Sequence, residues 1–230
     1  MAIGYLDLLG VSNKLLHEDI HSTLRMYEQR HLAIAVSKAW FGAGEQVDSQ
    51  RVDSFVFSDS LVFTSRIENL ALVTAVTAST FELLLNHHKT PSRGVIVTGE
   101  MCVNKETNFL LGKPLVQAAS IEQCLNAPCL TVLLPEQDEN TFNELAKYDW
   151  ISDQSVLFKK GSKEVLAKKS INTDLIHLVK YYCLEDDRHS ILSKSILIYE
   201  ELSETCNSRV QELMANGVDL CRNEVLTLCK

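Results

Sequence analysis

Short apolar runs alternate with longer stretches of helical periodicity through the first part of the chain. Residues 2–9 form an apolar run closed by Gly10, which predicts a buried strand with one ionisable residue, Asp7, inside it. From Ser12 onward, apolar residues recur at steps of three and four until the glycine-rich break at 41–44. This spacing predicts one long helix or two stacked helices.

The next hundred residues repeat this alternation. Residues 51–66 place two apolar stretches on either side of Ser58-Asp59-Ser60, which predicts a hairpin with Asp59 at its tip. Residues 69–88 have a helical pattern that stops before Pro91, and 92–100 read as a strand. Pro114 then favours the start of a helix that continues over 115–125.

The last part of the chain is predicted to be mainly helical. Residues 129–134 are strand-like, and 154–166 resemble a hairpin with its turn at 159–162. Residues 173–229 contain no Pro and a single Gly, which predicts two or three helices. We therefore expect an α/β (α+β) fold, with a sheet domain over 1–170 and a C-terminal helical extension over 171–230 packed on that domain.

Composition narrows the classes of partner and compartment. The 230 residues carry 30 Asp plus Glu against 22 Lys plus Arg, and a net charge of −8 disfavours nucleic acid and anionic membranes as partners. Seven cysteines without a C-x-x-C pair favour a reducing compartment. The N-terminus lacks signal-peptide features, and polar residues interrupt the apolar run over 70–85. These features predict a cytoplasmic protein with no membrane partner.

Two patterns suggest chemistry. Asp7 and Asp59 converge if their strands are neighbours, and two carboxylates can then hold two divalent cations, Mg²⁺ or Mn²⁺. The alternative is a strand Asp that caps a helix and a turn Asp that bonds its own backbone. The segment from His17 to His21 matches H-E-x-x-H, a zinc motif, but no third ligand follows it, so a solvated helix face is the favoured interpretation.

Four segments occur in the order seen in one enzyme family. They are YLDLLGV at 5–11, FSDS at 57–60, RGVIVTGE at 93–100 and GKPLVQAASIE at 112–122. Over residues 2–170 this order resembles the class III nucleotide cyclases. The SDS turn, the Arg-Gly strand start and the short chain look most like the pyrimidine cyclases of bacterial antiphage defence, which make cyclic UMP or cyclic CMP.

The resemblance implies a ferredoxin-like sheet, a homodimer with active sites at the interface, and two bound divalent cations, Mn²⁺ or Mg²⁺. Asp7, Asp59 and the backbone carbonyl of Leu8 would be the metal ligands. The implied reaction is attack of a ribose 3′-hydroxyl on the α-phosphate of a nucleoside triphosphate, with pyrophosphate leaving. Its product would be a second messenger in antiviral defence.

Departures from the purine-cyclase pattern suggest the substrate. Where adenylate cyclases carry a base-reading Lys and Asp, this chain has Phe55 and Lys113, so the resemblance favours a pyrimidine, most simply UTP, with Lys113 donating to a base carbonyl. The usual Asn and Arg of the later helix align with Val116 and Ser120, and Arg93 is a candidate to contact the triphosphate in their place. A purine cyclase with unusual base contacts, or a catalytically silent cyclase-like binding module, are the alternatives.

Overall fold

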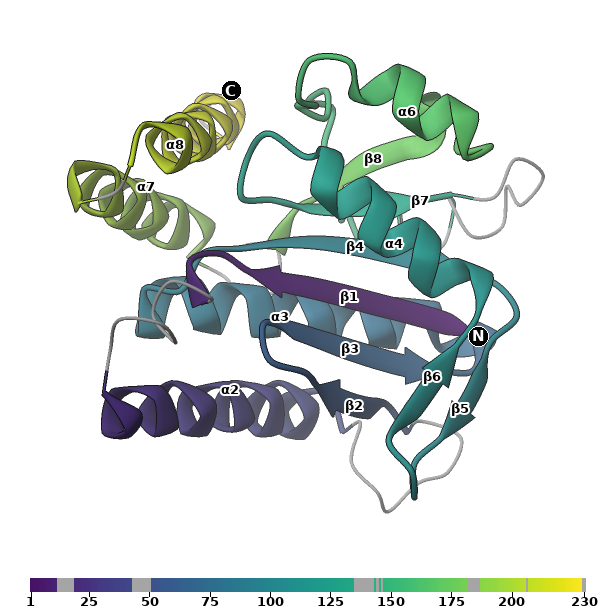
Figure 1. Ribbon diagram of the computed structural model, residues 1–230. Helices are drawn as coiled ribbons and strands as arrows, with labels where there is room; N and C mark the ends of the chain where they lie inside the picture. The colour runs from purple at the N-terminus through teal and green to yellow at the C-terminus, as the bar shows by residue number, and fades with distance from the viewer. Residues whose placement is uncertain are drawn as a thin grey trace.

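A computed structural model describes residues 1–11, 19–42, 51–134, 143, 145, 147–181, 187–205 and 207–228. Within these ranges, a six-stranded sheet has helices on both faces (Figure 1). Its strands are β1 (Ala2–Leu8), β2 (Asp53–Val56), β3 (Ser60–Ser65), β4 (Ser92–Thr98), β7 (Leu130–Leu133) and β8 (Ile176–Val179). The helices are α2 (Ile20–Trp40), α3 (Leu70–His88), α4 (Lys113–Cys124), α6 (Ser162–Lys168), α7 (Arg188–Thr205) and α8 (Ser208–Leu228).

The strand order identifies the architecture. The sheet runs β2-β3-β1-β4-β7-β8, and β1 is antiparallel to both of its neighbours, β3 and β4. The chain order β1, α2, β2, β3, α3, β4 with this spatial order is the ferredoxin-like split βαβ arrangement. Strand β7 then adds parallel to β4, and β8 adds antiparallel to β7. The predicted ferredoxin-like α/β fold with flanking helices is confirmed.

Alternation along the strands divides the core into two apolar clusters. In β1, Leu6 and Leu8 belong to the cluster shared with α2, α3, α7 and α8, whereas Ile3 belongs to the cluster that includes α4 and α6. Successive strand side chains point to opposite faces, so Asp7 lies on the α4 face with Ile3. Packing on both faces therefore places a carboxylate beside a covering helix.

Helix α3 is the central helix of the other face. The segment Ile67–His88 is long and apolar enough to cross a membrane, but 67% of its most apolar window is buried inside the protein. Thr77 of α3 lies directly against Gly4 of β1, where a Cβ atom would fall 2.0 Å from Thr77 Oγ1. Close packing on the sheet accounts for the apolar character of this helix.

Three local expectations differ from the structure. Residues 176–179, expected in the helical extension, form the edge strand β8. Residues 154–166, expected as a hairpin with its turn at 159–162, instead lead into helix α6 at 162–168, which has Gly161 (φ +79°) as its N-cap. A small hairpin, β5 (Cys102–Asn104) with β6 (Phe109–Leu111), was not expected at all. These are short elements whose state depends on what packs against them.

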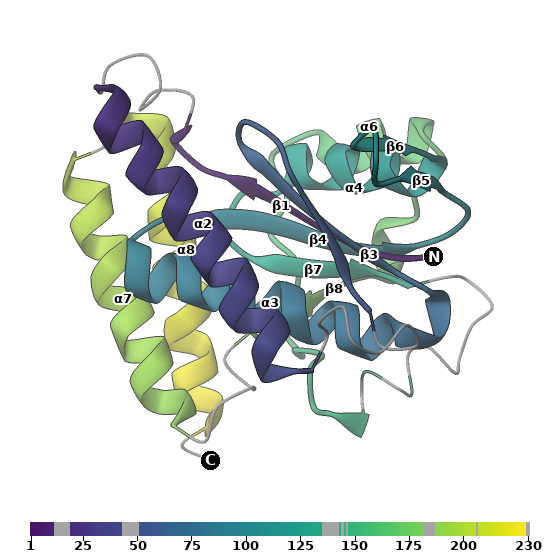
Figure 2. The ribbon, with the colours of Figure 1, turned by 90° about the horizontal axis from the view of Figure 1, so that it is seen from below.

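The C-terminal helices α7 and α8 pack against each other at one end of the sheet and beside α3 (Figure 2). A buried polar chain joins them to the body. Tyr181 donates to Ser195 Oγ of α7 at 3.0 Å, and Ser195 donates to Asn86 Oδ1 of α3 at 3.1 Å. Buried hydrogen bonds of this kind fix one orientation of the helical pair on the domain.

Candidate active site

Strand register brings three polar side chains into one row across the sheet. Asp7 lies opposite Ser60 of β3 and opposite Arg93 of β4. Directly opposed residues on antiparallel strands point to the same face, here the face covered by α4. Asp7, Ser60 and Arg93 are thus neighbours because of the pairing of three strands.

Asp59 reaches this row through the turn between β2 and β3. The amide of Leu8 donates to the carbonyl oxygen of Asp59 at 2.8 Å, which places the two predicted acidic residues on adjacent backbones. Hydroxyls of Ser58 and Ser60 donate to Asp59 Oδ1 at 3.2 and 3.4 Å. The turn therefore brings Asp59 next to the end of β1, close enough for its charge to help raise the pKa of Asp7. That the two carboxylates bind metal together stays a prediction.

Helix α2 holds the turn from the opposite face of the sheet. Arg30, only 1% exposed, donates from Nη1 to the carbonyl oxygen of Ser58 at 2.7 Å, and its guanidinium lies 4.8 Å from the Tyr27 ring centroid. Burial lowers the pKa of Arg30, while the charge of Asp59 opposes this shift. Sequence reasoning missed Arg30, because an Arg among polar helix residues gives no sign of burial.

Arg93 joins two carboxylates beneath α4. Its Nη2 atom lies 3.4 Å from Asp7 Oδ2 and in direct contact with Glu122 Oε1, and its Nη1 donates to the carbonyl oxygen of Leu125 at 3.3 Å. The side chain of Glu122 is 4% exposed. Glu122 lies in the segment GKPLVQAASIE at 112–122, but the sequence did not indicate a role for it. Its burial arises only from the packing of α4 on β1 and β4, which the sequence does not show.

Burial and repulsion between carboxylates raise the pKa values of Asp7 and Glu122. Burial raises the pKa of Glu122 to about 7, against the attraction of Arg93 and with the help of the Asp7 charge. Burial also raises the pKa of Asp7, where Arg93 again opposes the shift and the Asp59 charge adds to it. The charge of Asp7 disfavours ionisation of Glu122, and of the two groups Glu122 has its pKa raised to about 7, so it holds its proton more tightly than an exposed carboxyl does.

Two lysines lie near the ends of this arrangement. Burial, followed by the charges of Arg93 and Arg209, lowers the pKa of Lys159. Lys169 donates from Nζ to Ser120 Oγ at 3.0 Å, at a position where the resemblance led us to expect an arginine. The side chain of Val116, which aligns with the usual Asn, is exposed. The ammonium group of Lys169, the residue after α6, therefore lies beside Ser120.

The two residues predicted to read the base come from different elements, Phe55 from β2 and Lys113 from α4. Phe55 is on the α4 face, opposite Val62, and is only 4% exposed within an apolar cluster. Lys113 is exposed at the first residue of α4, nine residues before Glu122, hence about 13 Å away along the helix axis. Lys113 and Glu122 thus lie near opposite ends of α4.

Among the described residues, the site offers two carboxylates for a hard divalent cation but no larger cluster of ligands. Asp7 and Asp59 supply carboxylate oxygens, and repulsion between them favours an intervening cation. No group of three or more His, Cys, Asp or Glu side chains with metal-binding geometry occurs among the described residues. His17 and Glu18 of the H-E-x-x-H match lie outside the described ranges, and α2 begins at Ile20 with Asp19 as its N-cap.

No protein-family model and no curated protein matches the sequence. Among solved structures, the chain is similar to a bacterial light-regulated adenylyl cyclase (11% identity, 84% of this chain and 96% of that chain, TM-score 0.48). It is also similar to the adenylyl cyclase CyaB from P. aeruginosa (11% identity, 77% of this chain and 92% of that chain, TM-score 0.47). The chemistry argued for this protein rests on its own residues.

Proposed function

We propose that the protein is a metal-dependent nucleotide cyclase that acts on a pyrimidine nucleoside triphosphate, most simply UTP. The observation that carries the proposal is the bond from the Leu8 amide to the Asp59 carbonyl, which places Asp59 beside the end of β1 that carries Asp7. Asp7, Asp59 and the Leu8 carbonyl would hold two divalent cations, Mn²⁺ or Mg²⁺. When bound, such cations neutralise a triphosphate and lower the pKa of the attacking ribose hydroxyl.

The other residues of the site orient the two carboxylates. Arg93 contacts Asp7 Oδ2, which fixes the direction of this carboxylate and leaves its other oxygen for a ligand. Glu122 accompanies the guanidinium, so that the cation is not buried alone. Arg30 fixes the turn that carries Asp59 by binding the Ser58 carbonyl. Preorganisation of this kind supplies much of the catalysis of phosphoryl transfer.

The preference for a pyrimidine rests on Phe55 and Lys113. Phe55 and Lys113 stand where adenylate cyclases carry the base-reading Lys and Asp, so the purine-reading pair is absent. The Lys113 ammonium can only donate hydrogen bonds, which suits the carbonyl oxygens of uracil. Because Lys113 begins α4, whereas Glu122, which meets Arg93 beside Asp7, lies near the other end of this helix, we propose a homodimer in which each site combines Asp7 and Asp59 of one protomer with Lys113 of the other. The cyclic product would act as a second messenger, as the resemblance implies for antiviral defence.

A direct assay tests the reaction. Purified protein is incubated with each of the four ribonucleoside triphosphates and Mn²⁺, and the products are identified by mass. We expect a cyclic pyrimidine monophosphate and pyrophosphate, and we expect Asp7→Asn and Asp59→Asn each to reduce turnover by at least about a hundredfold, since each removes a metal ligand. Asp19→Asn, at the N-cap of α2, is the matched control and keeps wild-type turnover.

Two results would redirect the proposal. A purine cyclic monophosphate as the main product would retain the cyclase and reject the pyrimidine. Nucleotide binding without any product would favour the silent binding module, an outcome compatible with the engagement of Asp7 by Arg93 and Glu122 in the nucleotide-free protein.

A further inference from the structure

Helix α8 packs directly on the segment that follows α4. Gly217 of α8 lies where a Cβ atom would fall 3.2 Å from Pro128 Cδ and 3.1 Å from ring atoms of Tyr199. A glycine inside a helix costs about 1 kcal/mol relative to alanine. Its presence here permits the backbone of α8 to approach Pro128 and Tyr199 closely.

Two side chains of α8 hold the same segment by hydrogen bonds. Asn216 donates from Nδ2 to the carbonyl oxygen of Asn126. Asn126 donates in return from its own Nδ2 to Glu212 Oε1 at 3.1 Å. The backbone and the side chain of Asn126 are therefore both bound by one turn of α8.

The residue before Asn126 is a direct partner of the candidate site. The carbonyl oxygen of Leu125 accepts the bond from Arg93 Nη1, at 3.3 Å, while Arg93 Nη2 faces Asp7 and Glu122. On the other side, the amide of Asn126 donates to the Leu157 carbonyl at 2.8 Å, and Leu125 bridges to Phe158. The position of the Leu125 carbonyl thus depends on contacts to residues 157–158 and to α8.

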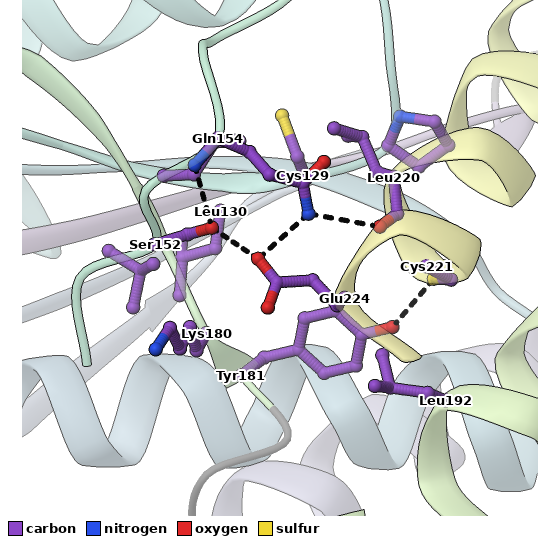
Figure 3. A pocket seen from close by; sticks show the side chains of 13 residues that line it. Cys129, Leu130, Ser152, Gln154, Lys180, Tyr181, Leu192, Leu220, Cys221 and Glu224 are labelled. Carbon is purple, nitrogen blue, oxygen red and sulfur yellow. Dashed lines mark hydrogen bonds between the residues drawn. The ribbon is translucent and has the colours of Figure 1, made fainter. Parts of the chain in front are cut away.

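The far end of α8 is fixed independently, beside a small cavity (Figure 3). Glu224, which is buried, binds Ser152 Oγ and accepts from Gln154 Nε2 at 2.8 Å. The same amide of Gln154 donates to the Leu220 carbonyl at 3.1 Å. Because this end is anchored to the 152–154 segment, loss of the Asn216 contact would not detach the helix.

From these contacts we propose that Asn216 is a positioning residue for Arg93. It fixes residues 125–126, whose Leu125 carbonyl directs the guanidinium toward Asp7 and Glu122. The C-terminal helical extension thereby contributes to the order of the carboxylate site without touching it. The consequence for catalysis rests on the proposed function, whereas the positioning of Arg93 does not.

Asn216→Ala tests the proposal, with Asn223→Ala as the matched control, because Asn223 is an exposed Asn on the same helix. The first readout is the Nε–H resonance of Arg93 in the nucleotide-free and metal-free protein, assigned by its loss in Arg93→Lys. This group is buried and has no hydrogen-bond partner among the described residues, so its exchange with solvent reports guanidinium order. We expect exchange to be about tenfold faster in Asn216→Ala and unchanged in the control.

The second readout is turnover and its Mn²⁺ dependence. We expect Asn216→Ala to lower kcat several-fold and to raise the Mn²⁺ concentration for half-maximal rate, and to add nothing further in an Arg93→Ala background. Glu212→Ala, which removes only the contact to the Asn126 side chain, should give a smaller change of the same kind and guards against misfolding of the first variant.

The outcomes are distinguishable. A lower melting temperature with unchanged Arg93 exchange in both variants would reduce Asn216 to a purely structural role and overturn the proposal. If the wild-type protein cyclises no nucleotide, the proposed function fails, and the Arg93 exchange still decides the positioning role.

Discussion

At the residue scale, the raised pKa of Glu122 has a consequence for stability. Burial raises the pKa of Glu122 from 4.5 to about 7 in the folded chain, so between these values the folded state binds more protons than the unfolded state. The free energy of unfolding of the metal-free protein therefore falls as pH rises from about 4.5 to 7, by about 2 to 3 kcal/mol.

We predict that Glu122→Gln removes most of this fall, because an amide cannot release the proton. Urea denaturation at pH 4.5 and 7.5 measures it, and Glu204→Gln, at an exposed position of α7, is the control. A slope in Glu122→Gln equal to that of the wild type would show that other groups carry the pH dependence.

A second residue-scale prediction concerns the base. Lys113→Ala should lower turnover of UTP and reduce its advantage over CTP, since a lost donor leaves a base carbonyl unpaired. Phe55→Ala should admit purines to a small extent by enlarging an apolar slot, at a cost in stability that follows from the burial of this ring. Relative turnover of the four triphosphates by both variants decides this. Unchanged ratios in both would place base reading elsewhere.

The sequence revealed some site residues and concealed others for physical reasons. Asp7 stands out because it interrupts an apolar strand pattern, and Asp59 because it lies in a turn signal between two apolar stretches. Arg30 lies in a helix with several other charged residues, which gives no sign of burial. The burial of Glu122 and Arg30 depends on residues more than 25 positions away in the chain, as the partners Arg93 and Ser58 show. Periodicity carries no information about such packing.

At the element scale, the contact between β1 and α3 is the tightest glycine contact described. Gly4→Ala would place a Cβ atom against Thr77 Oγ1, whose hydroxyl is also bonded to the Val73 carbonyl at 2.6 Å. We predict a loss of stability of about 2 kcal/mol or more. Adding Thr77→Ala should recover most of the lost stability. Thermal or urea unfolding of the wild type, the two single variants and the double variant measures this. Equal losses in the single and double variants would contradict a local clash.

The elements themselves were predictable in proportion to their length. The strand at 2–8, the hairpin around Asp59 and the helix over 70–88 carry long or distinctive patterns, and all agree with the structure. Strand β8 and helix α6 have four and seven residues, and here sequence reasoning chose the wrong state. Short segments take the state that their neighbours in space impose, and β8 forms where β7 lies on one side of it and residues 150–152 on the other.

At the scale of the whole molecule, the proposed homodimer makes a prediction about mixed chains. Asp59→Ala should be inactive, and Lys113→Ala should be active with reduced preference for UTP. In a heterodimer, the only site that retains Asp59 receives Lys113 from the inactive chain. Adding increasing amounts of the Asp59→Ala protein to the Lys113→Ala protein should therefore restore the wild-type ratio of UTP to CTP turnover. A ratio that stays at the Lys113→Ala value would place both residues in one protomer or exclude Lys113.

The central place of β1 in the sheet has a consequence for the synthesis of the protein. Both neighbours of this strand come later in the chain, since Asp7 pairs with Ser60 and with Arg93. On the ribosome, β1 stays half-paired until residues 92–98 emerge, and the apolar helix α3 is made before β4 and β7 exist to complete the sheet. Nascent chains of this length should thus be aggregation-prone and bind chaperones that recognise exposed apolar segments, with release once β4 is synthesised.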